Sequence, residues 1–162
     1  MIEKLVFAVK NILNYLNKKK INRLGLNTQL FCRIEKRHPK SKINIGSGSL
    51  INGKLVTETE KSIIDIKDNV FIGGNTIIDC KDEIIIENDV LVSYECVIFD
   101  HDSHSTKSSL RKNDLSKFKN KDLNWDQVDS KKIHIKKNAW ICARSMVMKG
   151  TIIGQGSIVA AG

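Results

Sequence analysis

The chain contains little proline and few aromatic residues. Pro39 is the only proline among 162 residues, and phenylalanine, tryptophan and tyrosine together make up 6%. So few aromatic side chains argue against the stacking platforms on which single-stranded nucleic acids bind. The cysteines form no CxxC pair, which is typical of reduced, buried thiols rather than of a disulfide framework. They are Cys32, Cys80, Cys96 and Cys142.

Long apolar runs are also missing. No stretch approaches the length that a membrane span requires. The opening residues MIEKLVFAVKNIL do not resemble a signal peptide, because Glu3 and Lys10 interrupt the apolar run and no cleavage site follows. Together with the unpaired cysteines, this predicts a cytoplasmic protein.

Positive charge is in excess, with a formal net charge of +9 at pH 7. Such a balance suits nucleic acid, an anionic membrane surface or a phosphate-rich small ligand. Without aromatic residues or a nucleic-acid motif beside the charge, we predict no nucleic-acid partner. The basic residues gather in two groups. The first is Lys18, Lys19, Lys20, Arg23, Arg33, Lys36, Arg37, Lys40 and Lys42, and the second is Lys107, Arg111, Lys112, Lys117, Lys119 and Lys121.

Residues 2–20 have the spacing of an amphipathic helix, which ends in a run of three lysines. One interpretation is a helix packed on the domain. The other is a peripheral contact of residues 1–20 with the inner face of an anionic membrane. We divide the chain into an N-terminal helix and linker, residues 1–40, and a repeat domain, residues 41–162.

The strongest pattern is an apolar residue at every sixth position, a period that neither a helix nor a simple strand has. It predicts a solenoid of six-residue repeats, that is, a parallel β-helix. In the last part of the chain it comprises Ile135, Ile141, Val147, Ile153 and Val159. Earlier it comprises Ile66, Ile72, Ile78 and Ile84, then, after a shift of two residues, Ile86, Val92 and Ile98, with a trace at Ile45 and Ile51.

Three six-residue repeats make one triangular coil, and each coil buries its aliphatic residues against its neighbours. The pattern stops from about Phe99 to Lys132, and we predict a long inserted loop there, at about 99–132, that carries function. The repeats continue to Gly162 without a polar cap. We therefore expect another subunit to cover that end, or the native chain to continue.

Three segments resemble the hexapeptide-repeat acyltransferases, in particular the branch of maltose/galactoside, capsule and O-antigen acetyltransferases. They are VIFDHDSHS (97–105), followed by Arg111, Asp114, Leu115 and Trp125, IHIKKNAWICARSMVMKGTIIGQGSIVAAG (133–162) and, more loosely, IIIENDVLVSYECVIF (84–99). The resemblance covers about residues 64–162. It implies an all-β, left-handed parallel β-helix with an N-terminal α-helix, assembled as a homotrimer with acetyl-CoA between neighbouring subunits.

The resemblance also implies a single catalytic histidine in the inserted loop. His104 is the best match and His101 is its rival. A neutral imidazole can take the proton of a sugar hydroxyl as the oxygen attacks the thioester carbonyl. A carboxylate on the other ring nitrogen would fix the tautomer, and Asp100, Asp102 and Glu95 are the candidates. The histidines and aspartates of this loop are also metal-ligand types, but the reaction requires no metal.

For acetyl-CoA, the family places small side chains of the terminal coils along the pantetheine arm. Position by position, this implies contacts from Ala143, Ala161 and Gly162. Trp140 matches the family's tryptophan near the active centre, and Arg144 is placed to reach a phosphate; the alternatives are a packing role for Trp140 and a surface charge for Arg144. Cys142 replaces the family's usual glycine, and the chain stops before a threonine-lysine pair that usually helps to hold the cofactor. For the acceptor we predict contacts from Asn75, Asp79, Glu95, Arg111 and Trp125.

We therefore predict an O-acetyltransferase that moves an acetyl group from acetyl-CoA to a hydroxyl of a sugar or polysaccharide intermediate. Two alternatives stay open. One is N-acetylation of an amino-sugar nucleotide, and the other is a non-catalytic β-helix used as a binding module. The sequence does not name the acceptor.

Overall fold

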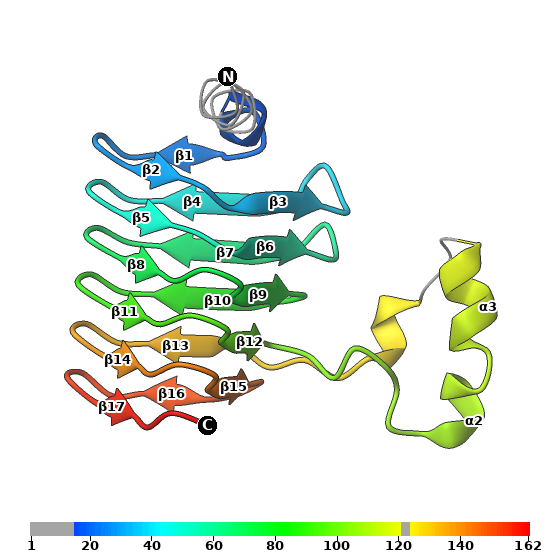
Figure 1. Cartoon of the computed structure of the whole chain (residues 1–162). Coiled ribbons are helices and arrows are strands. Elements are labelled where there is room, and N and C mark those ends of the chain that lie inside the picture. Colours follow the sequence, from blue (N-terminus) through cyan, green and yellow to red (C-terminus); the bar gives the residue numbers. More distant parts are fainter. Residues whose placement is uncertain (1–14, 121–123) are drawn as a thin grey trace, which may run out of the picture.

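The computed structural model describes residues 15–120 and 124–162, which form a left-handed parallel β-helix of six stacked coils. Figure 1 shows the first coil at one end of the stack and the last coil at the other. Three parallel sheets run along the stack, and strands from successive coils lie side by side in each sheet. The predicted fold is confirmed.

Each sheet takes one strand from each coil, except that the last coil contributes none to the third sheet. The first sheet holds β1 (Arg23–Leu24), β4 (Lys42–Ile45), β7 (Ile63–Ile66), β10 (Glu83–Ile86), β13 (Ile133–Ile135) and β16 (Ile152–Ile153). The second holds β2 (Gln29–Leu30), β5 (Leu50–Ile51), β8 (Phe71–Ile72), β11 (Leu91–Val92), β14 (Trp140–Ile141) and β17 (Ile158–Val159). The third holds β3 (Arg33–Lys36), β6 (Lys54–Thr57), β9 (Ile77–Cys80), β12 (Val97–Phe99) and β15 (Met146–Met148).

The core is a set of vertical stacks of branched aliphatic side chains. In the second sheet, Ile51 pairs with Ile72, Ile72 with Val92, and Val92 with Ile141. All four are fully buried. The residues of the six-residue pattern therefore point inward, as predicted, and each contacts its counterparts one coil above and below.

The two-residue shift in the pattern has a structural cause at the first sheet. Strands β7 and β10 each bury two side chains, Ile64 with Ile66 and Ile84 with Ile86, and these pair across the coils. The first sheet therefore contributes two inward residues per coil where the other sheets mainly contribute one.

The corner between the first and second sheets turns through residues with positive φ. Asn69 and Asp89 have φ values of 57° and 61°, and Asn27 and Asn138 occupy equivalent turns. Asparagine and aspartate tolerate this left-handed conformation better than most residues do. These side chains also connect the coils, since Asn69 Nδ2 donates to Asp89 Oδ1 at 3.3 Å.

The stack is interrupted once, between β12 and β13. The inserted segment, residues 100–132, is called the arm below; residues 121–123 within it lie outside the described part. It contains α2 (Ser108–Arg111), α3 (Asp114–Lys119) and the 3-10 helix η1 (Trp125–Gln127). The arm leaves the stack at the corner between the third and first sheets and projects away from it (Figure 1). The predicted insertion at about 99–132 is confirmed, and β10 and β13 still pair directly across it.

The N-terminal helix predicted over residues 2–20 lies mostly outside the described residues. Within the described part, residues 15–18 are helical, and Asn17 donates from its side chain to the carbonyl of Cys32 at 2.6 Å. No helix among the described residues is long and apolar enough to cross a membrane. The membrane contact of residues 1–20 stays a prediction.

Candidate functional site

Asp100 anchors the arm at its base. Its carboxylate accepts the backbone N–H groups of Lys81 and Asp82 at 2.7 and 2.8 Å, and the Cys80 thiol lies 3.3 Å away. Burial raises the pKa of this carboxyl group, and the two backbone N–H groups oppose the shift. Asp100 therefore joins the arm to the neighbouring coil, and its buried oxygens are directed at the stack rather than at solvent.

His101 is the second residue of the arm and is buried, with a side chain that is 1% exposed. Its ring stacks on Phe99 with centroids 5.6 Å apart and meets the edge of Trp125 at 5.1 Å. Nδ1 accepts the backbone N–H of Ser103 at 3.0 Å. Nε2 faces Asp79 Oδ1 at 3.3 Å, but neither atom has a hydrogen-bond partner within the described residues, so their contact is electrostatic.

His104 lies in the open, at the end of a tight turn. Its N–H donates to the carbonyl of Asp102 at 2.7 Å, across Ser103, which has a φ of 62°. The His104 ring is 53% exposed, and its Nδ1 lies 2.8 Å from Oδ2 of Asp114 in α3. No described residue hydrogen-bonds to Nε2. A carboxylate that holds Nδ1–H leaves Nε2 as the free basic nitrogen, the arrangement that general-base catalysis needs.

The carboxylates expected to orient His104 have other partners. Asp102 pairs with Lys149 at 2.6 Å, and Glu95 pairs with Arg144 at 2.8 Å. Asp100 is occupied by the backbone N–H groups described above. The expectation that one of these three orients His104 is therefore corrected, because Asp114 occupies that position.

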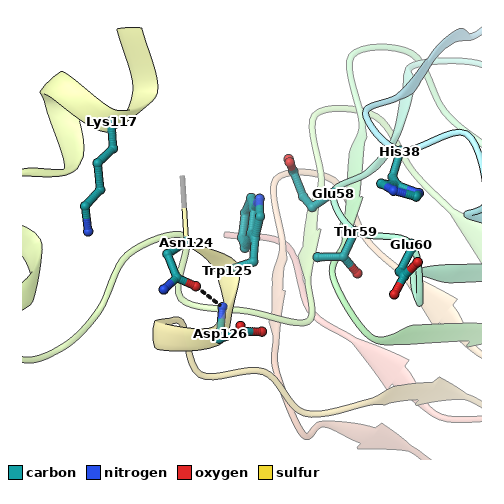
Figure 2. Close-up of a pocket in the computed structure, with 8 residues that line it drawn as sticks. All are labelled: His38, Glu58, Thr59, Glu60, Lys117, Asn124, Trp125 and Asp126. Atoms are coloured by element: carbon teal, nitrogen blue, oxygen red, sulfur yellow. Dashed lines mark hydrogen bonds between the residues drawn. The ribbon is translucent and has the colours of Figure 1, made fainter. Parts of the chain in front are cut away.

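A cavity of about 550 Å³ lies between the arm and the corners of the first coils. Figure 2 shows Lys117 of α3 on one side, the coil corners on the other, and Trp125 between them. Trp125 is half-buried, and Asn124 beside it accepts the N–H of Asp126 at 3.0 Å. The lining residues are His38, Glu58, Thr59, Glu60, Lys117, Asn124, Trp125 and Asp126.

Glu58 is the buried acid of this cavity. Its side chain is 1% exposed and contacts Arg37 at 2.8 Å. Burial and the nearby charge of Asp79 raise its pKa to about 8, against the opposing charge of Arg37. The raised pKa favours the protonated form of this carboxyl group, which can donate as well as accept a hydrogen bond.

The residues predicted to hold acetyl-CoA lie on the other side of the stack from the arm. Trp140 begins β14 and is 45% exposed, and its indole N–H reaches Ser93 Oγ at 3.3 Å. Ala143 and Gly162 are stacked at the next corner, where the Gly162 N–H donates to the Ala143 carbonyl at 3.3 Å. Ala161 and Arg144 are exposed.

This corner between the second and third sheets carries small residues beside bulky ones, since Tyr94 is 56% exposed there and Arg144 pairs with Glu95 at 2.8 Å. A Cβ atom added at Gly74 or Gly162 would meet no described atom within 4 Å. Within one chain, the structure does not bring the residues predicted to hold acetyl-CoA together with His104.

The predicted acceptor residues are scattered. Asn75 and Glu95 occupy positive-φ corner positions, with φ values of 59° each, so the turn explains their presence. Arg111 donates to the carbonyl of Ser105 at 2.7 Å and thereby braces the arm. Asp79 lies beneath His101, and only Trp125 lines the cavity.

Two residues of the site received no role in the sequence analysis. Asp114 belongs to the segment quoted after VIFDHDSHS, and its spacing of ten residues from His104 carries no recognisable pairing signal. Glu58 sits at a coil corner where an acid is ordinarily solvated. Asp114 and Lys117 are three residues apart, a spacing that places both side chains on one face of a helix. This spacing is the one sequence signal that links Asp114 to Lys117, which lines the cavity.

Metal-binding geometry is not found among the described residues, where no group of three or more histidine, cysteine, aspartate or glutamate side chains could hold an ion. The aspartates and histidines at 100–104 point to different partners, as described above.

No protein-family model and no curated protein sequence matches the chain significantly. Solved structures do match. AntD, an N-acyltransferase from Bacillus cereus in complex with dTDP and 3-hydroxybutyryl-CoA, aligns at 16% identity with a TM-score of 0.57, over 91% of this chain and 73% of AntD. A mutant of AntD with dTDP and coenzyme A aligns at 14% identity and a TM-score of 0.52, over 91% of this chain and 78% of the mutant.

A third structure, the polySia-specific acetyltransferase NeuO, aligns at 18% identity over 87% of this chain and 71% of NeuO. Its TM-score of 0.31 is too low to support a common fold. At the identities of the AntD structures, the likeness shows a shared fold and leaves the reaction to be argued from the site.

Proposed function

We propose that this protein transfers an acetyl group from acetyl-CoA to a hydroxyl of a sugar or glycan intermediate, with His104 as the general base. The observation that carries the proposal is the pairing of an exposed imidazole with a largely enclosed carboxylate, His104 Nδ1 with Asp114 Oδ2 at 2.8 Å. The fold that the chain shares with AntD, a CoA-binding acyltransferase, supports the same chemistry.

The tautomer of His104 determines which of its nitrogens takes and returns the proton. With Nδ1–H held by Asp114, Nε2 takes the proton of the acceptor hydroxyl as its oxygen attacks the thioester carbonyl. The tetrahedral oxyanion needs an N–H donor, and collapse breaks the C–S bond while the imidazolium returns its proton to the departing thiolate. Acetyl-CoA supplies the activated acyl group, and Asp114 stabilises the imidazolium between the two transfers.

The separation of the arm that carries His104 from the corner proposed for acetyl-CoA supports an assembly of several copies, which we propose is a homotrimer. The base is carried by the arm, at the corner between the third and first sheets. The small residues proposed for acetyl-CoA lie at the corner between the second and third sheets. One chain therefore cannot bring them together, whereas a neighbouring copy could place its arm against this corner.

The outer face of the second sheet supplies a surface for such an assembly. Leu50, Phe71, Leu91, Trp140 and Ile158 pair in register along it. Leu91 is 48% exposed and Ile158 66%. A continuous apolar stripe of this kind marks an interaction face, and we propose that a second copy of this chain covers it.

We propose that a part of the acceptor beyond its reacting hydroxyl occupies the cavity of Figure 2, with a sugar ring against Trp125, because His104 is not among the residues that line this cavity. The half-buried indole offers an apolar face with a polar edge. The carboxyl groups of Glu58, Glu60 and Asp126 are suited to bind hydroxyl groups.

The test is the His104→Ala variant with acetyl-CoA and a panel of sugar acceptors, following release of the coenzyme A thiol. We expect turnover to fall at least about a hundredfold, the usual scale for loss of a general base. Acetyl-CoA binding by calorimetry and the mass in solution should be unchanged. His134→Ala is the matched control, because His134 is a coil-surface histidine paired with Glu87 at 2.6 Å. Near-normal turnover of His104→Ala would refute the assignment.

A second candidate is N-acylation of an amino-sugar nucleotide, which the AntD complex with dTDP and an acyl-CoA favours. A free amine needs less activation than a hydroxyl, so the two acceptors can be separated by direct competition. Preferential acylation of the amine, retained in His104→Ala, would support the second candidate. Preferential acylation of the hydroxyl, abolished in His104→Ala, would support the first.

A further inference from the structure

We propose that His101 is a positioning residue, which holds the turn that presents His104 and takes no part in proton transfer itself. The proposal rests on His104 as the base, and it explains why a second histidine is buried three residues before it. The His101 side chain is 1% exposed and covered by Trp125. A base at that depth would not reach the hydroxyl of an acceptor.

The turn that His101 holds is unusual. The His104 N–H donates back to the Asp102 carbonyl at 2.7 Å, so the chain reverses within three residues around Ser103. Ser103 has a φ of 62°, a conformation that side-chain-bearing residues seldom adopt. Such a turn persists only where surrounding contacts determine it, and it sets the direction in which the next side chain leaves the backbone.

His101 supplies the contact on which this turn depends. Its Nδ1 accepts the Ser103 N–H at 3.0 Å, which fixes the backbone on the other side of the bend. Asp102 is tied to the coils through Lys149 at 2.6 Å, and its N–H donates to the carbonyl of Asp129, in the returning part of the arm, at 3.1 Å. These bonds bring His104 within 2.8 Å of Asp114 in α3.

Asp79 keeps the His101 ring in the required tautomer. Because Nδ1 accepts a hydrogen bond, the proton of the neutral ring lies on Nε2, which faces Asp79 Oδ1 at 3.3 Å. A carboxylate favours that N–H by charge although the two atoms are not aligned as a hydrogen bond. The opposite tautomer would direct an N–H at the N–H of Ser103. Asp79 was predicted to contact the acceptor, and we assign it instead to holding the tautomer of His101.

Two substitutions separate the two nitrogens. In His101→Asn the amide oxygen can occupy the place of Nδ1 and accept the Ser103 N–H. In His101→Gln the longer amide reaches the place of Nε2 and leaves the Ser103 N–H without an acceptor. We expect kcat of His101→Gln to fall at least about tenfold with the KM for acetyl-CoA within about twofold, because a small displacement of a base affects the chemical step more than binding.

His101→Asn should retain kcat within about threefold, because it keeps the acceptor on which the turn depends. A merely structural role in packing would affect the two variants alike, since both remove the ring from between Phe99 and Trp125. Equal losses in the two variants would overturn the proposal even if His104 remains the base.

A measurement that needs no enzyme activity tests the turn separately from the reaction. In the 15N-labelled wild-type protein, a coupling across the hydrogen bond should connect the Ser103 amide nitrogen with His101 Nδ1. The His104 ring nitrogens should shift in His101→Gln and stay close to wild-type in His101→Asn. If His104→Ala proves fully active, the proposed function fails while these shifts still report on the turn. Absence of the coupling in the folded wild-type protein would overturn the positioning role alone.

Discussion

The coil stack and the arm keep their shapes by different means. In the stack, aliphatic residues repeat and bury one another, and Ile51, Ile72 and Ile141 are each 0% exposed. In the arm, α2 buries none of its residues and α3 buries only Asp114. The stack is therefore stabilised by many equivalent contacts, whereas the arm depends on a few polar anchors that cannot replace one another. Such a division allows the segment that carries His104 to be exposed on a scaffold whose stability does not depend on it.

The largest contrast should come from replacing a leucine by alanine, once in the stack and once in the arm. Leu55 is 0% exposed in the third sheet and Leu115 is 68% exposed in α3. Leu55→Ala should lower the free energy of unfolding by about 2–5 kcal/mol, because it removes buried methyl groups and leaves a cavity. Leu115→Ala should change it by no more than about 0.5 kcal/mol.

Urea unfolding followed by circular dichroism at one protein concentration measures both changes. A comparable loss in Leu115→Ala would show that the arm belongs to the same cooperative core, or that another copy covers α3. Repeating the measurement at several protein concentrations separates these two explanations.

An intermediate effect is expected at the point where the two regions join. Asp100→Asn replaces a carboxylate that accepts the N–H groups of Lys81 and Asp82 by an amide that can turn an NH2 group toward them. We expect a loss of about 1–3 kcal/mol, the scale of unsatisfied buried hydrogen-bonding groups. Limited proteolysis should show faster cleavage within residues 102–129 and unchanged protection of the coils. Uniformly faster cleavage along the whole chain would contradict the anchoring role.

The last contrast concerns pH. The folded-state pKa of Glu58 is about 8, above its ordinary value of 4.5, so the folded chain holds this proton more tightly than the unfolded chain does. The stabilisation is complete below about pH 4.5 and is lost as the pH rises through 8, since in that window the folded state binds more protons.

Glu58→Gln, which cannot ionise, should remove this part of the pH dependence. Between pH 5 and pH 8 the melting temperature of the wild-type protein should fall relative to that of the variant by about ten degrees, because a pKa of about 8 in the folded state against 4.5 in the unfolded state corresponds to several kcal/mol over that range. Melting curves of both proteins across that range measure the difference. Parallel pH profiles would mean that Arg37 keeps Glu58 ionised.

The stack could be predicted from sequence because its rule is periodic. Every residue of the series from Ile135 to Ile153 points inward, as its six-residue spacing predicts. The arm follows no such rule. The spacing places His104 in an exposed loop, but its partner Asp114 is brought to it by the fold of α3, and no local pattern encodes that approach. Likewise, only the family resemblance favours His104 over His101 in the sequence, and the contacts of His101 with Phe99 and Trp125 supply the physical difference between them.

Direct pairing across the insertion has a consequence for how the chain folds. Ile84 pairs with Ile64, 20 residues earlier, but its partner on the other side is Ile133, 49 residues later. Because closure entropy grows only with the logarithm of loop length, the longer connection costs about 0.8 kcal/mol more than an uninterrupted coil. The first four coils can thus form on the ribosome before the arm is synthesised, and the last two can then add to a finished edge. Pulse-labelled hydrogen exchange during refolding would show β13 gaining protection after β10 if assembly proceeds in that direction.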